Sequence, residues 1–298
     1  MDFHYITGVI LGIFGGCLTQ FGQLLEKRAV NQYRVDSQEN GFFRRLVKSP
    51  VWLSGVFFGL GGGTVAYMLA QSLIGPALTP GLMASGLVIL AVGSVRMNRE
   101  TLNTSEIIGI VLMILGILAL GLSGLAINST QVRITLGNRN ALERIAVFTI
   151  SFFLMSFITR SLAPRIKNRR GMLIALANGF LSCLSDFWIN PLLALIAFVL
   201  LGHSTPSQFI IFTIASAILV MVATTVTWTN QLAFKYAQAS NVVPVAQVPI
   251  QISPILVYFF IYALTPPNSI SVVYILTGTV LTIVAGFLLG RRREDPID

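Results

Sequence analysis

The chain has 298 residues, of which 54% are hydrophobic and only 10% are charged, and its mean hydropathy is +0.79. About a quarter of the residues are charged in a typical soluble domain, so this composition excludes that class. The net charge of +9 does not predict nucleic-acid binding, because the basic residues are distributed loop by loop and form no single face. They fit an anionic membrane leaflet instead.

Nine apolar segments follow one another along the chain. Each has roughly the 20 residues that the ~30 Å hydrocarbon core of a bilayer requires. They cover residues 5–25, 51–70, 78–97, 105–125, 143–162, 172–196, 208–231, 241–263 and 271–290. We therefore predict an all-α integral membrane protein with nine transmembrane helices.

The loops between these segments differ in charge. With nine crossings, successive loops alternate between the two sides, and one side then receives seventeen of the twenty basic residues: Lys27, Arg28, Arg34, Arg44, Arg45, Lys48, Arg96, Arg99, Arg160, Arg165, Lys167, Arg169, Arg170, Lys235, Arg291, Arg292 and Arg293. The other side holds Arg133, Arg139 and Arg144. Basic residues stay on the cytoplasmic side. This predicts an N-terminus outside and a C-terminus inside, in a multi-pass protein of the cell membrane.

The chain also repeats itself weakly. Residues 12–23 and 178–189 share four identities and two polar-for-polar matches at an offset of 166, and residues 77–80 match 241–244 at an offset of 164. These offsets correspond to five spans, and an odd number inverts one copy across the membrane. We predict one polytopic domain with repeat one at 1–125, a connector helix at 126–165, repeat two at 166–290 and a cytoplasmic tail at 291–298. Inverted repeats are typical of secondary transporters, although apolar segments can also match by chance.

Several short motifs carry a resemblance to a known family. Residues 67–70, 77–80 and 99–102, with Gly109 and Gly116, resemble the end of a four-helix EamA-type unit of the drug/metabolite transporter superfamily. Residues 237–244, with Gly278 and Gly286, resemble its second copy, although residues 265–268 lack the acidic residue found at Glu100. Nine spans with an outside N-terminus are most similar to the NIPA-type magnesium transporter branch. This resemblance implies transport of Mg²⁺.

One predicted helix carries a polar stripe. Asn178, Ser182, Asp186 and Asn190 are spaced by four, so they share one face of the segment 172–196. Asp186 is the only acidic residue deep inside a predicted span, and an Asp at a helix centre costs about 2.5–3.5 kcal/mol on insertion scales. We therefore expect it to face a central cavity, where it would be the metal ligand if the solute is a cation.

Other embedded polar residues extend this candidate site. Gln20 lies on the first predicted helix, Thr227 and Gln231 share a face of the seventh, and Gln247 and Gln251 are one turn apart on the eighth. We expect these five, with the stripe on 172–196, to bind the solute. The alternative is that they form helix–helix hydrogen bonds, worth only about 0.6 kcal/mol each on average.

These features predict a secondary transporter that moves a small polar or cationic solute by alternating access, with a NIPA-like Mg²⁺ transporter as the sharper version. A lipid-modifying enzyme would expose a His or acidic cluster at the membrane interface, and a non-transporting scaffold would need neither a buried carboxylate nor an inverted duplication. We expect no enzymatic activity and no cofactor. The expected partners are the solute and membrane lipids, and association into a homodimer is left open.

Overall fold

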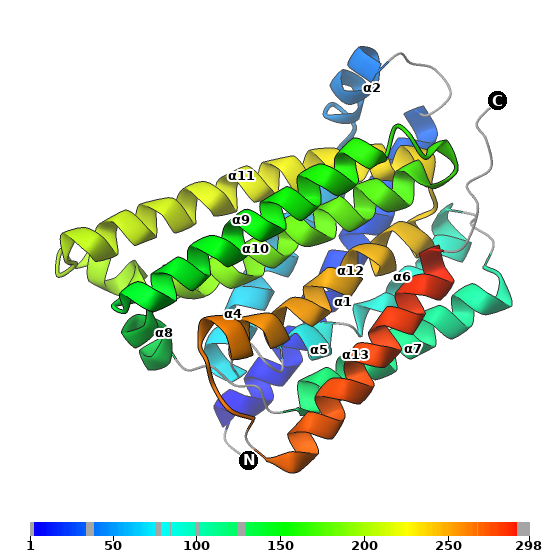
Figure 1. Ribbon diagram of the computed structural model, residues 1–298. Coiled ribbons are helices and arrows are strands. Elements are labelled where there is room, and N and C mark those ends of the chain that lie inside the picture. The colour runs from blue at the N-terminus through cyan, green and yellow to red at the C-terminus, as the bar shows by residue number, and fades with distance from the viewer. Residues whose placement is uncertain are drawn as a thin grey trace.

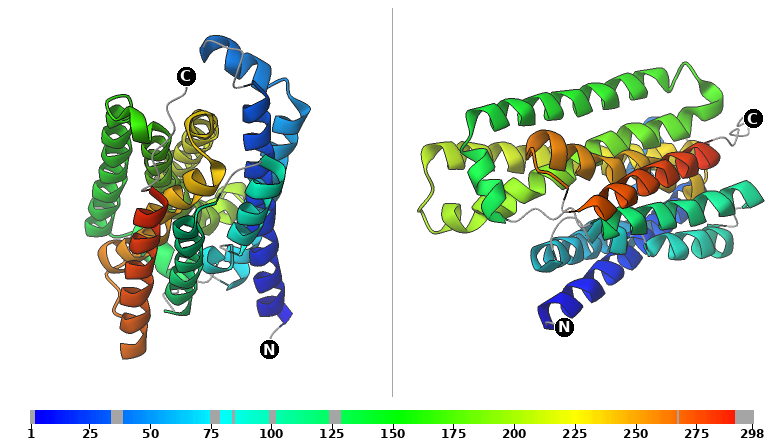
Figure 2. Two further views of the ribbon diagram at one scale, coloured as in Figure 1. Left: turned by 90° about the vertical axis from the view of Figure 1, so that its right-hand side faces the viewer. Right: turned by 60° about the horizontal axis from the view of Figure 1, so that its bottom comes forward.

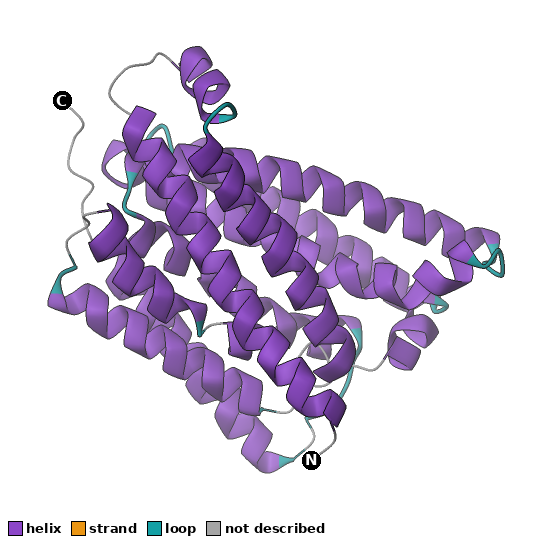
Figure 3. Cartoon of the chain, turned by 180° about the vertical axis from the view of Figure 1, so that it is seen from behind, coloured by secondary structure: helices purple, strands orange, loops and turns teal. Residues whose placement is uncertain are grey.

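The computed structural model describes residues 3–33, 39–74, 79–83, 85–98, 102–123, 129–266 and 268–290, and every regular element in these ranges is a helix (Figures 1 and 3). In chain order they are α1 (Phe3–Tyr33), α2 (Glu39–Leu46), α3 (Pro50–Val56), η1 (Phe57–Gly63), α4 (Thr64–Ile74), α5 (Thr79–Met83), α6 (Gly86–Asn98), α7 (Thr104–Leu122), α8 (Ser129–Leu136), α9 (Arg139–Leu162), η2 (Lys167–Arg169), α10 (Arg170–Leu200), α11 (Pro206–Tyr236), α12 (Ala239–Leu256), η3 (Val257–Ile261) and α13 (Ser269–Gly290).

Within the ranges given above, seven helical segments are long and apolar enough to cross a membrane. They are Ile6–Gln32, Pro50–Leu73, Arg139–Leu162, Arg170–Leu200, Pro206–Tyr236, Ala239–Ile261 and Ser269–Leu289. Two shorter apolar helices, Gly86–Asn98 and Thr104–Leu120, occupy the third and fourth predicted spans. Large apolar side chains face outward, as Phe57 and Phe157 do at 70% and 69% exposure. An all-helical, multi-pass membrane protein is thus confirmed, while the count of nine crossings and the orientation stay predictions.

The structure corrects three details of the predicted helices. The span predicted at 78–97 consists of two helices, α5 and α6, because both the amide and the hydroxyl of Ser85 bond to the carbonyl oxygen of Leu82 and end the first one. The first helix does not end at residue 25 but continues to Tyr33. The region predicted as the connector helix, 126–165, contains two helices, α8 and α9.

The helices gather around α1 and α10, which lie on different sides of the bundle (Figures 1 and 2). α1 packs against α3, η1, α4 and α6, whereas α10 packs against α9, α11 and α12. α7 lies along α13, and the views of Figure 2 agree on this. There the carbonyl oxygen of Gly116 would be 2.7 Å from a Cβ on Gly278, so only small residues permit this approach.

Close backbone contact also fixes the wall formed by α1 and the π-helical segment η1. A Cβ on Gly22 would lie 2.5 Å from the backbone nitrogen of Gly59, and one on Gly63 would lie 2.2 Å from the hydroxyl oxygen of Thr19. Glycines therefore let η1 lie directly against α1. This contact places α4, which follows η1, beside the polar face of α1.

Candidate solute-binding cavity

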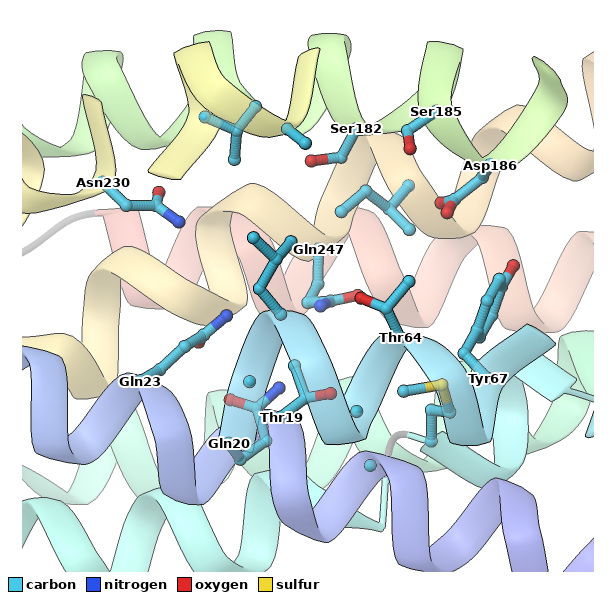
Figure 4. Close-up of a pocket in the computed structure, with 18 of the residues that line it drawn as sticks. Thr19, Gln20, Gln23, Thr64, Tyr67, Ser182, Ser185, Asp186, Asn230 and Gln247 are labelled. Carbon is cyan, nitrogen blue, oxygen red and sulfur yellow. The ribbon is translucent and has the colours of Figure 1, made fainter. Parts of the chain in front are cut away.

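A cavity of about 380 Å³ lies between α1, α4, α10, α11 and α12. Figure 4 shows polar side chains that reach into it from these helices. Its polar lining consists of Thr19, Gln20, Gln23, Glu26, Thr64, Tyr67, Ser182, Ser185, Asp186, Thr227, Asn230, Gln247 and Gln251. On α1 the lining runs from Gly16 to Glu26, which is about 15 Å at 1.5 Å per residue. The cavity is therefore an elongated chamber along the helix axes.

Asp186 lies at one end of this chamber, beside Tyr67 (Figure 4). Its backbone carbonyl on α10 accepts a hydrogen bond of 3.0 Å from Nδ2 of Asn190, one turn further along the same helix. Among the residues that the structure describes, none hydrogen-bonds or ion-pairs with the carboxylate itself. The carboxylate is therefore available to a polar solute.

Six of the nine predicted binding residues line the cavity. They are Gln20, Ser182, Asp186, Thr227, Gln247 and Gln251. Gln247 and Gln251 also contact each other, since Nε2 of Gln251 donates to Oε1 of Gln247 at 3.1 Å. The i, i+4 spacing thus brings Ser182 and Asp186, and likewise the two glutamines of α12, to the same chamber.

The other three predicted residues, Asn178, Asn190 and Gln231, lie behind the lining. Asn178 donates to Oδ1 of the lining residue Asn230 at 2.7 Å and accepts from the hydroxyl of Thr229 at 2.5 Å. Asn190 bonds the backbone of Asp186, as described above. Gln231 donates to the carboxylate of Glu26. Asn178 and Gln231 therefore bond the side chains of lining residues from behind, whereas Asn190 bonds the backbone of its own helix at Asp186.

Glu26 is the main residue that the sequence reading missed. The first span was predicted to end at residue 25, which assigned Glu26 to a loop and left Asp186 as the only embedded acid. In the structure Glu26 is 7% exposed and lines the cavity. The sequence did contain a signal that Glu26 belongs to the site. Gln20, Gln23 and Glu26 are spaced by three residues, so they form one polar strip along the helix.

The neighbouring Lys27 is also buried in the bundle, beyond the predicted end of the first span. Its side chain is only 3% exposed, and its Nζ donates to the carbonyl oxygens of Phe234 and Ala237, the latter at 2.6 Å. These carbonyls belong to the C-terminal end of α11, where the helix dipole favours a cation. Lys27 therefore joins α1 to the end of α11 inside the bundle.

Polar contacts also link the helices at both ends of the chamber. Beyond Asp186, Nε2 of Gln71 on α4 donates to Oδ1 of Asn190 on α10 at 3.1 Å. At the other end Gln231 on α11 bonds Glu26 on α1. The chamber thus lies between two side-chain contacts that join α1 and α4 to α10 and α11.

The donor set suits a hydrated hard cation better than a tightly bound metal. Within the described part of the chain, no group of three or more His, Cys, Asp or Glu side chains could hold a metal ion. The lining offers carboxylate, amide and hydroxyl oxygens, the ligand type that Mg²⁺ prefers while keeping several of its waters. The chamber can therefore bind a cation through its hydration shell.

A bundle of apolar helices around a cavity that contains a carboxylate and other polar groups is typical of a multi-pass membrane transporter. Over residues 3–295 the chain matches the family described as magnesium transporter NIPA. It belongs to this family, which is part of the drug/metabolite transporter superfamily, and the predicted resemblance is thereby confirmed. Searches of curated proteins and of solved structures found no match.

Proposed function

We propose that the chamber is the cargo site of a Mg²⁺ transporter and that Asp186 binds the hydrated ion. The observation that carries this proposal is a carboxylate at the wall of the chamber with no partner among the described residues. A carboxylate this deep in a membrane segment is costly unless water or a cation accompanies it. A hydrated divalent cation supplies both the positive charge and the water, because it arrives with its own hydration shell.

The size of the chamber supports a hydrated ion. Mg²⁺ holds its oxygen ligands at about 2.0–2.1 Å, and with a water radius of about 1.4 Å the hexahydrated ion fills a sphere of about 180 Å³. The chamber of about 380 Å³ exceeds this volume. Amide and hydroxyl groups of Gln20, Ser182, Thr227, Gln247 and Gln251 would then bond the waters, and Asp186 would supply the charge.

We propose that the ion crosses by alternating access between two inverted halves, without chemical change. Support comes from packing, because α1 contacts α4 and α6 in repeat one while α10 contacts α11 and α12 in repeat two. Glycine contacts between α7 and α13 join the halves. In this arrangement the chain crosses the cell membrane nine times, with its N-terminus outside and its C-terminus inside.

The experiment is Mg²⁺ uptake into liposomes that contain the purified protein and an enclosed Mg²⁺-sensitive dye. Asp186→Asn keeps the size of the side chain and removes its charge. We expect uptake to fall about tenfold or more, because a hydrogen bond to a charged group is worth about 1.5–3 kcal/mol. Glu143→Gln is the matched control, since that acid on α9 is 69% exposed. Uptake by Asp186→Asn at the wild-type rate would exclude Asp186 from the pathway.

An organic cation is a second candidate cargo. The observation that favours it is the apolar part of the lining, to which Leu60, Met68, Met83 and Ile250 contribute. Ligand pockets for small molecules combine such surfaces with a few polar groups. Competition separates the two candidates: inhibition of Mg²⁺ uptake by choline or a polyamine at concentrations where Na⁺ has no effect would favour the organic cation.

A further inference from the structure

Glu26 has surroundings that set it apart from Asp186. It lies on α1 three residues beyond Gln23, and Figure 4 places Gln23 and Asn230 at the opposite end of the chamber from Asp186. Its side chain is 7% exposed. Within the described ranges its one hydrogen-bond partner is Gln231, through a single amide N–H. Most of the acceptor capacity of this carboxylate is therefore unused.

The residues around Glu26 contain further acceptors without donors. The Oε1 atoms of Gln20, Gln23 and Gln231 are all buried, and none has a hydrogen-bond partner in the part of the chain that the structure describes. Gln20 and Gln23 line the chamber, and Gln231 is bonded to Glu26. A buried acceptor that lacks a donor costs free energy. The carboxylate of Glu26 and these amide oxygens therefore leave acceptor capacity unused on and behind the chamber wall, which favours hydrogen-bond donors or positive charge near Glu26.

The nearest buried cation is already engaged elsewhere. The ammonium group of Lys27 donates to the carbonyl oxygens of Phe234 and Ala237 at the end of α11. Glu26 forms no ion pair with it among the described contacts. The charge of Glu26 is thus left for a ligand from the chamber.

We propose that Glu26 forms a second divalent-cation site, separate from Asp186, and that a cation there competes with the Gln231 amide for the carboxylate. The proposal rests on the function proposed above, because the same cargo would occupy both sites. A hydrated divalent cation supplies the missing donors through its waters and twice the charge of a single ammonium group. The side-chain amides of Gln23 and Asn230, which line this end of the chamber, bond those waters, and Gln231 yields its bond when the ion arrives.

Binding of Mn²⁺ as a paramagnetic probe for Mg²⁺ tests this proposal. Electron paramagnetic resonance counts the ions bound by the purified full-length protein and gives their dissociation constants. We expect two ions in the wild type and in the surface control Glu143→Gln, and one ion in Glu26→Gln and in Asp186→Asn. Excess Mg²⁺ displaces both ions. A single ion in the wild type, or two in Glu26→Gln, overturns the proposal.

The competition with Gln231 gives a second and independent readout. Gln231→Met removes the competing amide and keeps the length of the side chain. It should tighten the site at Glu26 about tenfold or more, which is the equivalent of one hydrogen bond to a charged group. The Asp186 site should keep its affinity. A purely structural link between α1 and α11 predicts no such gain, so unchanged affinity in this variant also overturns the proposal.

The variant Glu26→Asp is the control for misfolding, because it keeps the carboxylate on a shorter side chain. This variant should bind two ions, with the second bound more weakly than in the wild type. Binding of only one ion by Glu26→Asp, with wild-type thermal stability, counts against the site. The two proposals fail differently: two ions in Asp186→Asn refute the cargo site at Asp186 alone, whereas two ions in Glu26→Gln refute the site at Glu26 alone.

Discussion

The contact of α1 with α5 and α6 allows a quantitative prediction for Gly16→Ala. A Cβ on Gly16 would lie 2.2 Å from the carbonyl oxygen of Met83, and a Cβ on Gly86 would lie 2.2 Å from the carbonyl oxygen of Gly16. Close carbon–oxygen contacts in proteins measure about 3.3–3.6 Å. The helices must therefore separate by about 1 Å, because neither backbone atom can rotate away.

The expected loss of stability follows from two opposing effects. Overpacking costs about 1–3 kcal/mol, while replacing Gly by Ala inside a helix returns about 0.8–1.0 kcal/mol. Because the close contact at 2.2 Å is with backbone atoms, the upper end of the overpacking cost applies. The net loss is then about 2 kcal/mol, with a fall in Tm of about 2–4 °C per kcal/mol. Because Gly16 and Met83 both line the chamber, Mg²⁺ uptake should fall as well.

Thermal unfolding of the purified protein in detergent measures this effect through the fluorescence of its three tryptophans. Gly61→Ala is the control, because a Cβ there would meet only the ring of Phe57, at 3.8 Å. Its Tm should equal or exceed that of the wild type. A wild-type Tm for Gly16→Ala, or an equal fall in both variants, would refute the argument from backbone contact.

Two further substitutions test single features of the fold. Gly202 has a φ of +72°, so Gly202→Ala should cost about 1 kcal/mol and lower the Tm. Gly137→Ala is the control, because no such φ occurs there. Equal Tm values for the two variants would contradict the prediction of backbone strain at Gly202. Asn178→Leu removes the bonds to Thr229 and Asn230 and should cost about 1–3 kcal/mol while raising the half-saturating Mg²⁺ concentration. The control Asn140→Leu, at an exposed position, should change neither the stability nor the half-saturating Mg²⁺ concentration. An unchanged half-saturating Mg²⁺ concentration in Asn178→Leu would mean that the bond from Asn178 to Asn230 is not needed for Mg²⁺ binding.

Hydropathy predicted where the helices lie, because burial of apolar groups in lipid is a property of each segment alone. It failed where a polar group has a partner inside the bundle. The first span was predicted to stop at residue 25, ahead of Lys27, since a cation normally stays in water. The helix instead continues to Tyr33, and the carbonyls of Phe234 and Ala237 accept hydrogen bonds from Lys27. The break between α5 and α6 depends on two local bonds, from the amide and the hydroxyl of Ser85 to the carbonyl oxygen of Leu82.

In the candidate site too, the sequence predicted what depends on one helix and missed what depends on contacts between helices. Helical spacing brought Ser182 and Asp186 to one face, because both lie on one continuous helix. Spacing could not separate lining residues from those behind them, since Asn178 and Gln231 are directed by contacts with other helices. The contact of Gln71 with Asn190 joins residues 119 positions apart. No local pattern in the sequence encodes a pairing of that kind.

The sparse donor set is itself an argument for transport. A site that passes an ion must bind it strongly enough to admit it and weakly enough to release it. A cage of several carboxylates would hold Mg²⁺ and strip its waters, which the ion gives up reluctantly. Asp186 and Glu26 instead lie at opposite ends of one chamber, with neutral amides and hydroxyls between them. An ion that keeps its hydration shell can exchange between the two carboxylates without ever being fully enclosed by protein ligands.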